Sequence, residues 1–470
     1  MQVVHMSAEC YPVAKVGGLG DVVGALPKYF NQTEGNDAIV VMPWVENKFT
    51  QTHRFVVDHQ AVLPFGRRIL QVKILRNHDL GYKLYMVQVE GFENRTQVYG
   101  YRNDAYHFIA FQVATLNWIH QWEHLPDVIH CHDFHTGFVP FYMSHSHQFP
   151  RLRNVPSIFT IHNGNYQGMM SWDVVDYFPW FDTWKLPLLK WNNTLNAMAT
   201  AVKCAWRVTT VSPQYMKELM QDSSLSELFH QESQKCVGIL NGIDNEEWNP
   251  ETDKHLRHHY SVDTVSEGKR ANKEEVCGHF HFDPELPLVS FIGRFAHQKG
   301  VDVLSDAVWR AINTYDAEMN FLIVGSGDPQ LARGLEQMKR YSRGKFNCYI
   351  GYNEELARKV YAASDFLVMP SRFEPCGLNQ FYALRYGTLP IVRTVGGLLD
   401  SIIDMNDENG CGIRFIQMNS NDILHALYRA SELYLDKEKF ATMRQHAMNQ
   451  DFSWEKSIKQ YTQLYKNAMP

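Results

Sequence analysis

The sequence lacks the features that would place it in several large classes of protein. Its 470 residues contain no run of 18 apolar residues, so no helix is predicted to span a membrane. The first eight residues lack the basic and apolar regions of a signal peptide, and the eight cysteines are scattered without a Cys-x-x-Cys pair. Reduced thiols without a signal peptide favour a cytoplasmic protein.

Positive charge is also scarce. Lysine and arginine number 45 against 51 acidic residues, which gives a net charge of −6. This balance argues against nucleic acid or an anionic membrane as the main partner, so a few well-placed cations must hold any anionic substrate. Hydrophobic residues make up 45% of the chain, which excludes a disordered protein. At roughly 150 residues per domain, the length predicts two large domains or three small ones.

Three familiar nucleotide-binding motifs are missing. The dinucleotide fingerprint fails because Val23 stands where the third glycine after Gly18 and Gly20 is required. This disfavours an NAD-dependent oxidoreductase. No Gly-Lys-Ser/Thr closes a Walker A loop, and Asp-x-Asp is absent from the whole chain. A nucleotide-sugar site bridged by a metal ion is therefore not expected, and we predict that the protein needs no metal or other cofactor.

The apolar segments predict an α/β fold. Short apolar strands alternate with helices along the first half, stop over the polar stretch 245–287, and restart at residues 288–292. We therefore predict two doubly wound parallel sheets, over residues 1–244 and 245–452. A final segment, 453–470, carries an apolar helical stripe of Ile458, Tyr461, Leu464 and Tyr465. Ligands of such sheets bind beyond the carboxyl ends of the strands, so a deep cleft between the two sheets is the expected site.

The first candidate site is the glycine-rich turn from Lys15 to Asp21, between the first strand and a helix predicted over residues 22–30. Glycines at 17, 18 and 20 allow backbone N–H groups to approach an anion at a helix N-terminus, and Lys15 adds positive charge. The alternative is a tight surface turn with no ligand.

A second group follows two central strands. The segment His130-Cys131-His132-Asp133-Phe134-His135 has the residue types of a metal site, but a tetrahedral site would need ligands from elsewhere. We expect polar side chains at the end of a strand that line a cleft; satisfied polar groups in the core are the alternative. His162 and Asn163 follow the next predicted strand in the same way.

The third group lies in the second half. Arg294 ends a predicted strand and Lys299 opens a helix, an arrangement that suits a diphosphate better than a single carboxylate. The loop 371–378 follows another strand, and its backbone N–H groups can also face phosphate. Glu374 in that loop would bind sugar hydroxyls.

Taken in order, these motifs resemble those of the bacterial glycogen synthase and plant starch synthase family. The resemblance extends over essentially the whole chain. The matching segments are Lys15-Val16-Gly17-Gly18-Leu19-Gly20-Asp21, His132-Asp133-Phe134-His135, Thr160-Ile161-His162-Asn163, Leu240-Asn241-Gly242-Ile243-Asp244, Arg294, Lys299-Gly300, Ser371-Arg372-Phe373-Glu374-Pro375-Cys376-Gly377-Leu378 and Gly396-Gly397-Leu398.

The resemblance implies a two-domain GT-B enzyme that moves glucose from ADP-glucose to the non-reducing 4-hydroxyl of an α-1,4-glucan, with retention of configuration. It also implies that segment 453–470 returns to the first domain. By the same resemblance, the diphosphate is bound by Lys15, Arg294, Lys299 and the amides of Gly377 and Leu378. The glucose is bound by Glu374 and Cys376, its pocket is lined by Asp133 and Asn241, and His162 supports the positive anomeric centre. Tyr352 stacks on the base, and the substrate site is completed by Gly17, Gly18, Asp21 and Asn163.

The sequence departs from the family pattern in a few positions. Phe134 stands where tryptophan is common and Asn379 where threonine is common, and the loop 90–100 is short. These changes bear on the acceptor more than on the donor. The alternatives are a related enzyme with UDP-glucose or another acceptor, a glucan phosphorylase, and a silent glucan-binding protein. Retention of Lys15, Arg294, Lys299 and Glu374 argues against the last. The sequence does not indicate an oligomeric state.

Overall fold

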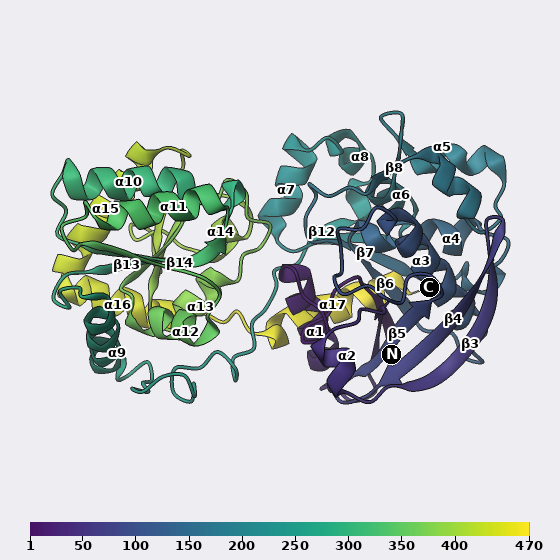
Figure 1. The fold of residues 1–470 in the computed structure, drawn as a ribbon, viewed down its shortest axis with the longest axis horizontal. Helices are drawn as coiled ribbons and strands as arrows, with labels where there is room; N and C mark the ends of the chain where they lie inside the picture. The colour runs from purple at the N-terminus through teal and green to yellow at the C-terminus, as the bar shows by residue number, and fades with distance from the viewer. Residues whose placement is uncertain (470) are drawn as a thin grey trace. The chain divides into compact units, whose positions relative to one another are not determined.

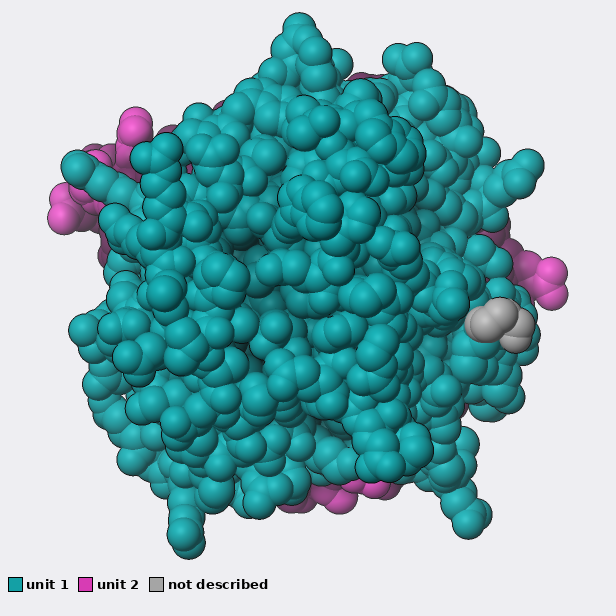
Figure 2. Space-filling model, turned by 90° about the vertical axis from the view of Figure 1, so that its right-hand side faces the viewer, with its two compact units in different colours: residues 1–241, 454–470 teal, residues 242–453 magenta. Residues whose placement is uncertain are grey.

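A computed structural model describes residues 1–469, which form two compact units. Unit 1 comprises Met1–Asn241 and the residues from Trp454 onward, and unit 2 comprises Gly242–Ser453 (Figure 1, Figure 2). The chain therefore crosses between the units twice. The crossings lie three residues and one residue from the boundaries that the sequence suggested, at 244/245 and 452/453.

A nine-stranded sheet forms the centre of unit 1, in the order β12-β11-β7-β6-β1-β2-β5-β4-β3. The seven strands from β12 to β5 run parallel. The strands are β1 (Gln2–Met6), β2 (Asp37–Pro43), β3 (Val56–Phe65), β4 (Arg68–Asn77), β5 (Lys83–Val89), β6 (Val128–His132), β7 (Ser157–Ile161), β11 (Arg207–Thr210) and β12 (Cys236–Gly238).

The prediction of a purely parallel sheet is wrong for the edge of unit 1. Strands β3 and β4 form a hairpin that pairs antiparallel with β5. Side chains of β3 and β4 alternate between buried and exposed positions at several points, because only one face of this edge is covered. A second, three-stranded sheet joins β8 (Met169–Met170), β10 (Thr194–Asn196) and β9 (Lys190–Trp191).

The sheet of unit 2 has six strands, all parallel, in the order β15-β14-β13-β16-β17-β18. Its strands are β13 (Leu288–Phe295), β14 (Asn320–Gly327), β15 (Phe346–Ile350), β16 (Phe366–Met369), β17 (Leu389–Arg393) and β18 (Ile413–Phe415). Strand β13 runs three residues beyond its predicted end at 292, because Gly293 pairs with Gly325 of β14 and the pairing continues to Phe295 and Gly327.

Helices cover both faces of the unit 2 sheet, as Figure 1 shows. One face carries α10 (Val301–Asn313), α11 (Pro329–Lys339), α14 (Gly396–Ser401) and α15 (Ser420–Leu435), and the other carries α9 (Val265–Phe280), α12 (Glu354–Ala363), α13 (Asn379–Arg385) and α16 (Lys437–Met448). The prediction that residues 245–287 lack structure is wrong for α9. This helix buries Val265, Val276, Cys277 and Phe280 but also Lys269. Because a charged residue shares the buried face, the sequence shows no clear helical period of apolar residues.

The main helices of unit 1 are α1 (Gly18–Phe30), α3 (Asp104–His120), α4 (Val139–His145), α6 (Ala197–Cys204), α7 (Pro213–Asp222), α8 (Ser226–Gln231) and α17 (Trp454–Ala468). Helix α17 packs beside α1, and the stripe Ile458, Tyr461, Leu464 and Tyr465 is buried in a core that includes Val22 and Phe30. None of the helices that the structure describes combines the length and apolar character needed to cross a bilayer.

Both parallel sheets change winding direction at a defined point. In unit 1 the chain winds outward from β1 to β2 and β5 on one side, and from β6 to β7, β11 and β12 on the other. In unit 2 the corresponding central pair is β13 and β16. Ligands of doubly wound sheets bind where the carboxyl ends of such a pair diverge. The candidate residues follow these strands.

Candidate active site

The switch point of unit 2 joins two of the predicted residues directly. Lys299, in a short 3-10 turn after β13, donates hydrogen bonds to both carboxylate oxygens of Glu374, at 2.8 and 2.6 Å. The Ser371 hydroxyl donates a third hydrogen bond to this carboxylate at 2.8 Å. Glu374 is 5% exposed. A buried carboxylate needs such partners, so the Lys299 side chain also has a structural role.

Glycines shape the loops that hold this pair. Gly300 has φ +68, and a Cβ there would lie 2.0 Å from the Pro370 carbonyl oxygen. A Cβ on Gly397 would lie 2.1 Å from the Cys376 carbonyl oxygen, and the Gly397 N–H donates to the Glu374 carbonyl. Only glycine allows the loops after β13 and β17 to approach the loop after β16 this closely.

Three other predicted residues of unit 2, Arg294, Gly377 and Leu378, carry polar groups that are free to bind a ligand. Arg294 is exposed on β13, and its guanidinium has no hydrogen-bond or ion-pair partner among residues 1–469. The amides of Gly377 and Leu378 precede α13 and likewise have no acceptor in the described part of the chain. Cys376 beside them is buried, and Tyr352, two residues after β15, is 85% exposed. A cation, two N–H donors and an exposed ring therefore follow the carboxyl ends of this sheet.

In unit 1 the glycine-rich turn is held by a residue that the sequence did not single out. The Glu9 carboxylate accepts hydrogen bonds from the amides of Val16 and Gly17, at 2.6 and 2.9 Å, and from the Tyr99 hydroxyl at 2.6 Å. These two amides are therefore already satisfied. The turn can offer a ligand the amide of Gly18, which has no acceptor among residues 1–469.

Helix α1 begins at Gly18, four residues before its predicted start at 22. The two glycines at 17 and 18 suggested a longer turn, but only Gly17 is extended, as the N-cap residue, and Gly18 is already the first helical residue. Lys15 lies beside the N-terminus of α1 and forms an ion pair with Asp21 at 2.7 Å. The Lys15 side chain is 42% exposed, so it remains accessible.

Asp133 follows β6 and is anchored to the loop after β7. Its Oδ1 atom accepts hydrogen bonds from the amides of His162 and Asn163, at 2.7 and 3.4 Å. Burial, with a smaller contribution from nearby Glu9, raises the pKa of the Asp133 carboxyl to about 7 against the opposing effect of the two amide hydrogen bonds. The carbonyl oxygen of His162 accepts no hydrogen bond within the described chain. Unit 1 thus presents a carboxyl on the loop after β6, bound to the backbone of His162 on the loop after β7, and an open carbonyl on that same histidine.

Asn241, the last residue of unit 1, is 5% exposed. Its side-chain oxygen is enclosed and has no partner among residues 1–469. A buried amide oxygen of this kind normally has a donor, so a polar ligand group or water is expected there. The Asn163 side chain, by contrast, accepts a hydrogen bond from the amide of Asn165 at 3.1 Å.

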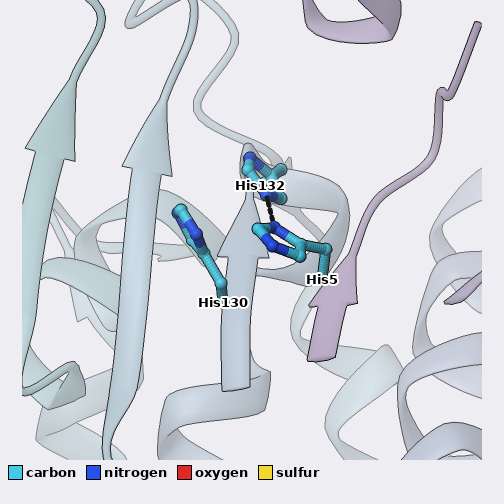
Figure 3. A group of neighbouring side chains, drawn as sticks. All are labelled: His5, His130 and His132. Carbon is cyan, nitrogen blue, oxygen red and sulfur yellow. Dashed lines mark hydrogen bonds between the residues drawn. The ribbon is translucent and has the colours of Figure 1, made fainter. Parts of the chain in front are cut away.

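The prediction that His130 and His132 line a cleft is wrong. Both are completely buried. Figure 3 shows them on β6 with His5 on β1, and a hydrogen bond of 3.1 Å joins His5 to His132. Nitrogen atoms of the three rings lie within 4.8 Å of one another. However, His130 has both nitrogens bound to hydroxyls, Tyr465 at 2.8 Å and Thr160 at 2.6 Å. This geometry fits a hydrogen-bonded core better than a metal site.

Sequence reasoning missed Glu9, Tyr99, His5 and Ser371. Glu9 could have been found, because it is an acidic residue in the apolar segment directly after β1. His5 gives no such signal, since one histidine inside an apolar strand is usually structural. The predicted residues themselves fall into one group in each unit; most lie near the switch points, whereas Asn241 and Tyr352 follow the edge strands β12 and β15.

Two family models match the chain. The starch synthase catalytic domain matches residues 2–231, and glycosyl transferases group 1 matches residues 286–432. The first match lies in unit 1 and the second in unit 2, and together they include all the candidate residues except Asn241.

Curated relatives match over the full length. The chain is 45% identical to a glycogen synthase of Flavobacterium johnsoniae over 468 residues, which cover 99% of this chain and 98% of the relative. It is 35% identical to a glycogen synthase of Exiguobacterium sibiricum, with 100% and 99% of the two chains covered.

Solved structures agree with these matches. The catalytic domain of starch synthase IV from Arabidopsis thaliana, bound to ADP and acarbose, has a TM-score of 0.89 and 32% identity and covers 100% and 99% of the two chains. Sucrose-phosphate synthase from Thermosynechococcus elongatus, at 18% identity and a TM-score of 0.64 over 99% and 98% of the chains, shares the fold. The two Rossmann-like units are thus those of the GT-B fold, and the chain belongs to the glycogen and starch synthase family of glycosyltransferases.

Proposed function

We propose that this protein transfers glucose from ADP-glucose to the non-reducing 4-hydroxyl of an α-1,4-glucan, with retention of configuration. The observation that carries the proposal is the switch point of unit 2. There an unpaired Arg294, the Lys299–Glu374 pair and the open amides of Gly377 and Leu378 offer partners for both a diphosphate and a sugar. A relative 32% identical to this chain has been solved bound to ADP and acarbose, which supports this assignment.

The reaction separates charge, and the site groups match each part. Breaking the bond between glucose and phosphate leaves negative charge on the β-phosphate and positive charge on the sugar ring. Arg294, Lys299 and Lys15, with the amides at 377 and 378, stabilise the first. The His162 carbonyl supports the second, and Glu374 binds the glucose hydroxyls. The leaving phosphate then accepts the proton of the acceptor hydroxyl, so no covalent carboxylate nucleophile is required.

The remaining residues complete the substrate contacts. Asp133 and the enclosed Asn241 oxygen bind the sugar. Cys376 packs beside the glucose and the exposed Tyr352 ring stacks on the base. The turn residues Gly17 and Gly18, with Asp21 and Asn163, shape the substrate site.

We propose that no metal ion takes part. The sequence has no Asp-x-Asp, and the cations named above supply the charge neutralisation that a metal would otherwise provide. Lys15 belongs to unit 1, whereas Arg294, Lys299 and Glu374 belong to unit 2. We therefore propose that neither unit transfers glucose alone.

The test is release of nucleotide from ADP-glucose and from UDP-glucose, each with and without glycogen. We expect ADP release that depends on glycogen, with elongated α-1,4 chains as the product. Faster turnover of UDP-glucose would change the donor assignment. Release of glucose 1-phosphate from glycogen and phosphate, without use of either nucleotide sugar, would show a phosphorylase. Glycogen binding without turnover would show a silent glucan-binding protein.

A further inference from the structure

A chain of three buried imidazoles runs from the candidate site into the core of unit 1. The Nε2 atom of His162 lies 3.0 Å from Nδ1 of His132, and Nε2 of His132 lies 3.1 Å from Nδ1 of His5. The chain ends at Nε2 of His5, which is enclosed and has no partner among residues 1–469. At the other end, Nδ1 of His162 also has no partner but reaches the surface of the unit.

All three rings are neutral at physiological pH. Burial lowers the pKa of His5 and of His162 to about 3, and it lowers the pKa of His132 well below its usual value, with the neighbouring histidines adding to the effect. A neutral imidazole carries one N–H and one acceptor nitrogen. The two hydrogen bonds therefore have to run in the same direction along the chain, which leaves two possible arrangements of protons.

The two arrangements differ at the enclosed end. If His162 donates to His132 and His132 donates to His5, then Nε2 of His5 carries a buried N–H without an acceptor. If the bonds run the other way, Nε2 of His5 is a buried acceptor without a donor. Orphaned buried N–H groups are rarer in proteins than under-satisfied acceptors, so the second arrangement has the lower free energy.

We propose that His5 and His132 are positioning residues that hold His162 with its proton on Nδ1. His5 donates from Nδ1 to His132, and His132 donates from Nδ1 to His162. The Nδ1–H of His162 then points out of the unit as a fixed donor, and its partner is an oxygen of the bound hexose. This last step rests on the proposed glucosyl transfer, whereas the proton arrangement does not.

His130 offers a matched control. It lies on the same strand as His132, is equally buried, and its ring lies 4.2 Å from that of His132 between centroids. However, its nitrogens bind Tyr465 and Thr160, so it is not part of the chain. Replacing His130 perturbs the same core without altering the hydrogen bond to His162.

The first experiment is nitrogen NMR of the whole protein labelled with ¹⁵N only at histidine, at pH 7.5. The His162 signals are identified by their loss in His162→Gln. We expect a protonated Nδ1 and an unprotonated Nε2 for His162, His132 and His5. Protonated Nε2 on His162 would overturn the proposal. This experiment needs no substrate, so it still tests the proton arrangement of the three histidines if the protein proves not to transfer glucose.

The second experiment compares kcat/KM for three variants. His132→Asn retains an N–H near the Nδ1 position and should stay within about threefold of the wild type. His132→Leu should lose about tenfold or more, and His130→Leu should lose no more than about threefold. In a His162→Ala background, His132→Leu should have no further effect, because its role acts through His162.

Several outcomes would contradict the proposal. These are equal losses for His132→Leu and His130→Leu, and an additive loss in the His162→Ala background. Stoichiometric zinc or nickel in the purified protein would show instead that the three histidines of Figure 3 bind a metal. If His132→Leu does not fold, the NMR result on the wild type alone decides.

Discussion

The two units share a winding order but fill their interiors with different polar groups. In each, the first strand lies inside the sheet; the six strands of unit 2 follow the order 3-2-1-4-5-6, and the parallel strands of unit 1 follow the same order with a seventh strand, β12, added at one end. Among residues 1–469, the buried histidines all belong to unit 1, namely His5, His107, His130, His132, His135 and His162. Unit 2 instead buries the charged side chains of Lys269, Lys273, Arg358 and Arg444.

Three of the four buried cations of unit 2 lie in ion pairs, whereas Lys269 contacts neutral oxygens. Asp365 lies 2.7 Å from Lys273 and 2.6 Å from Arg444, and Arg358 lies 3.4 Å from Asp253. Lys269 donates to three carbonyl oxygens and to the Thr388 hydroxyl, all within 3.1 Å.

This difference should make the stability of the two units respond differently to acid. Neutral imidazoles need no counterion, but each can be protonated once the chain unfolds. The ion pairs of unit 2 persist until their carboxylates are protonated, and the pKa of Asp365 is lowered by Lys273 and Arg444 against the opposing effect of burial. Unit 1 therefore buries more groups that take up protons on unfolding in mild acid than unit 2, where burial lowers the pKa of Lys269.

The largest predicted effect is selective acid unfolding of unit 1. Burial lowers the pKa of His5, His107, His135 and His162 to about 3. Well above pH 6.5 these histidines are neutral in both states, and as the pH falls through 6.5 the unfolded chain takes up protons that the folded chain excludes. At pH 5.5 each of the four groups costs about 1.4 kcal/mol, or about 6 kcal/mol together, and the raised pKa of Asp133 offsets part of this loss. Hydrogen exchange at pH 7.5, 6.5 and 5.5 should show unit 1 losing protection first. Equal loss in both units would contradict the comparison.

The second prediction concerns α17, which belongs only to unit 1. Tyr465 is fully buried, packs edge-on against Phe30 and bonds His130. Tyr465→Ala should cost about 3–5 kcal/mol because it leaves a large cavity. Tyr465→Phe keeps the ring and should cost only about 1 kcal/mol. Urea unfolding should show an earlier transition for unit 1 and an unchanged one for unit 2.

The third prediction tests unit 2 as the diphosphate side. Arg294→Ala and Lys299→Ala should each lower kcat/KM by about a hundredfold, or ~2.7 kcal/mol of transition-state stabilisation. Arg340→Ala is the control. This exposed arginine follows α11 and precedes β15, so it lies toward the amino ends of the strands, whereas the candidate residues follow the carboxyl ends.

The two variants should differ in stability. Arg294 has no partner in the described chain, so Arg294→Ala should unfold like the wild type. Lys299→Ala leaves the buried Glu374 carboxylate without its cation and should cost about 1–3 kcal/mol. Near wild-type turnover in either variant would remove the diphosphate assignment.

A smaller effect is expected where unit 2 holds its site loop. Gly397→Ala places a Cβ 2.1 Å from the Cys376 carbonyl oxygen, which forces the loop 374–378 to move. We expect about a tenfold loss of kcat/KM. Gly334→Ala in α11 has open space around its Cβ and should leave activity unchanged while stabilising the helix by about 0.5–1 kcal/mol. Normal activity in Gly397→Ala would show that the loop geometry is not critical.

The smallest effect is expected from metal removal. Excess EDTA should leave glucosyl transfer unchanged, since neither unit relies on a metal in the proposed mechanism. Activity that returns only when a divalent ion is added back would contradict this and would direct attention to the histidines of unit 1.

Much of the fold could be predicted from short apolar runs. Residues 157–161 and 366–369 coincide with β7 and β16, because a fully buried parallel strand is apolar on both faces. Helix α9 and the hairpin of β3 and β4 were missed. Their buried residues include lysines or alternate with exposed ones, and such patterns resemble loops.

Position after a predicted strand was enough to select Lys15, Asp133, His162, Arg294, Lys299 and Glu374, whereas the roles of Asn241, Cys376 and Tyr352 came from the family resemblance. The partners of these side chains were not predicted. Lys299 and Glu374 are 75 residues apart in the chain, and His5 and His132 are 127 apart. No local pattern indicates which distant side chains a sheet brings together.

By itself, the sequence determined the alternation of strands and helices, the two halves, and the residue types at the strand ends. Those follow from local periodicity and from the residues that turns require. Only the tertiary structure decided that Glu9 occupies the amides of the glycine turn, that Lys299 neutralises Glu374, and that His130 and His132 belong to the core. These outcomes depend on strand order, which sets the distances between residues far apart in the chain and so decides which polar groups satisfy one another.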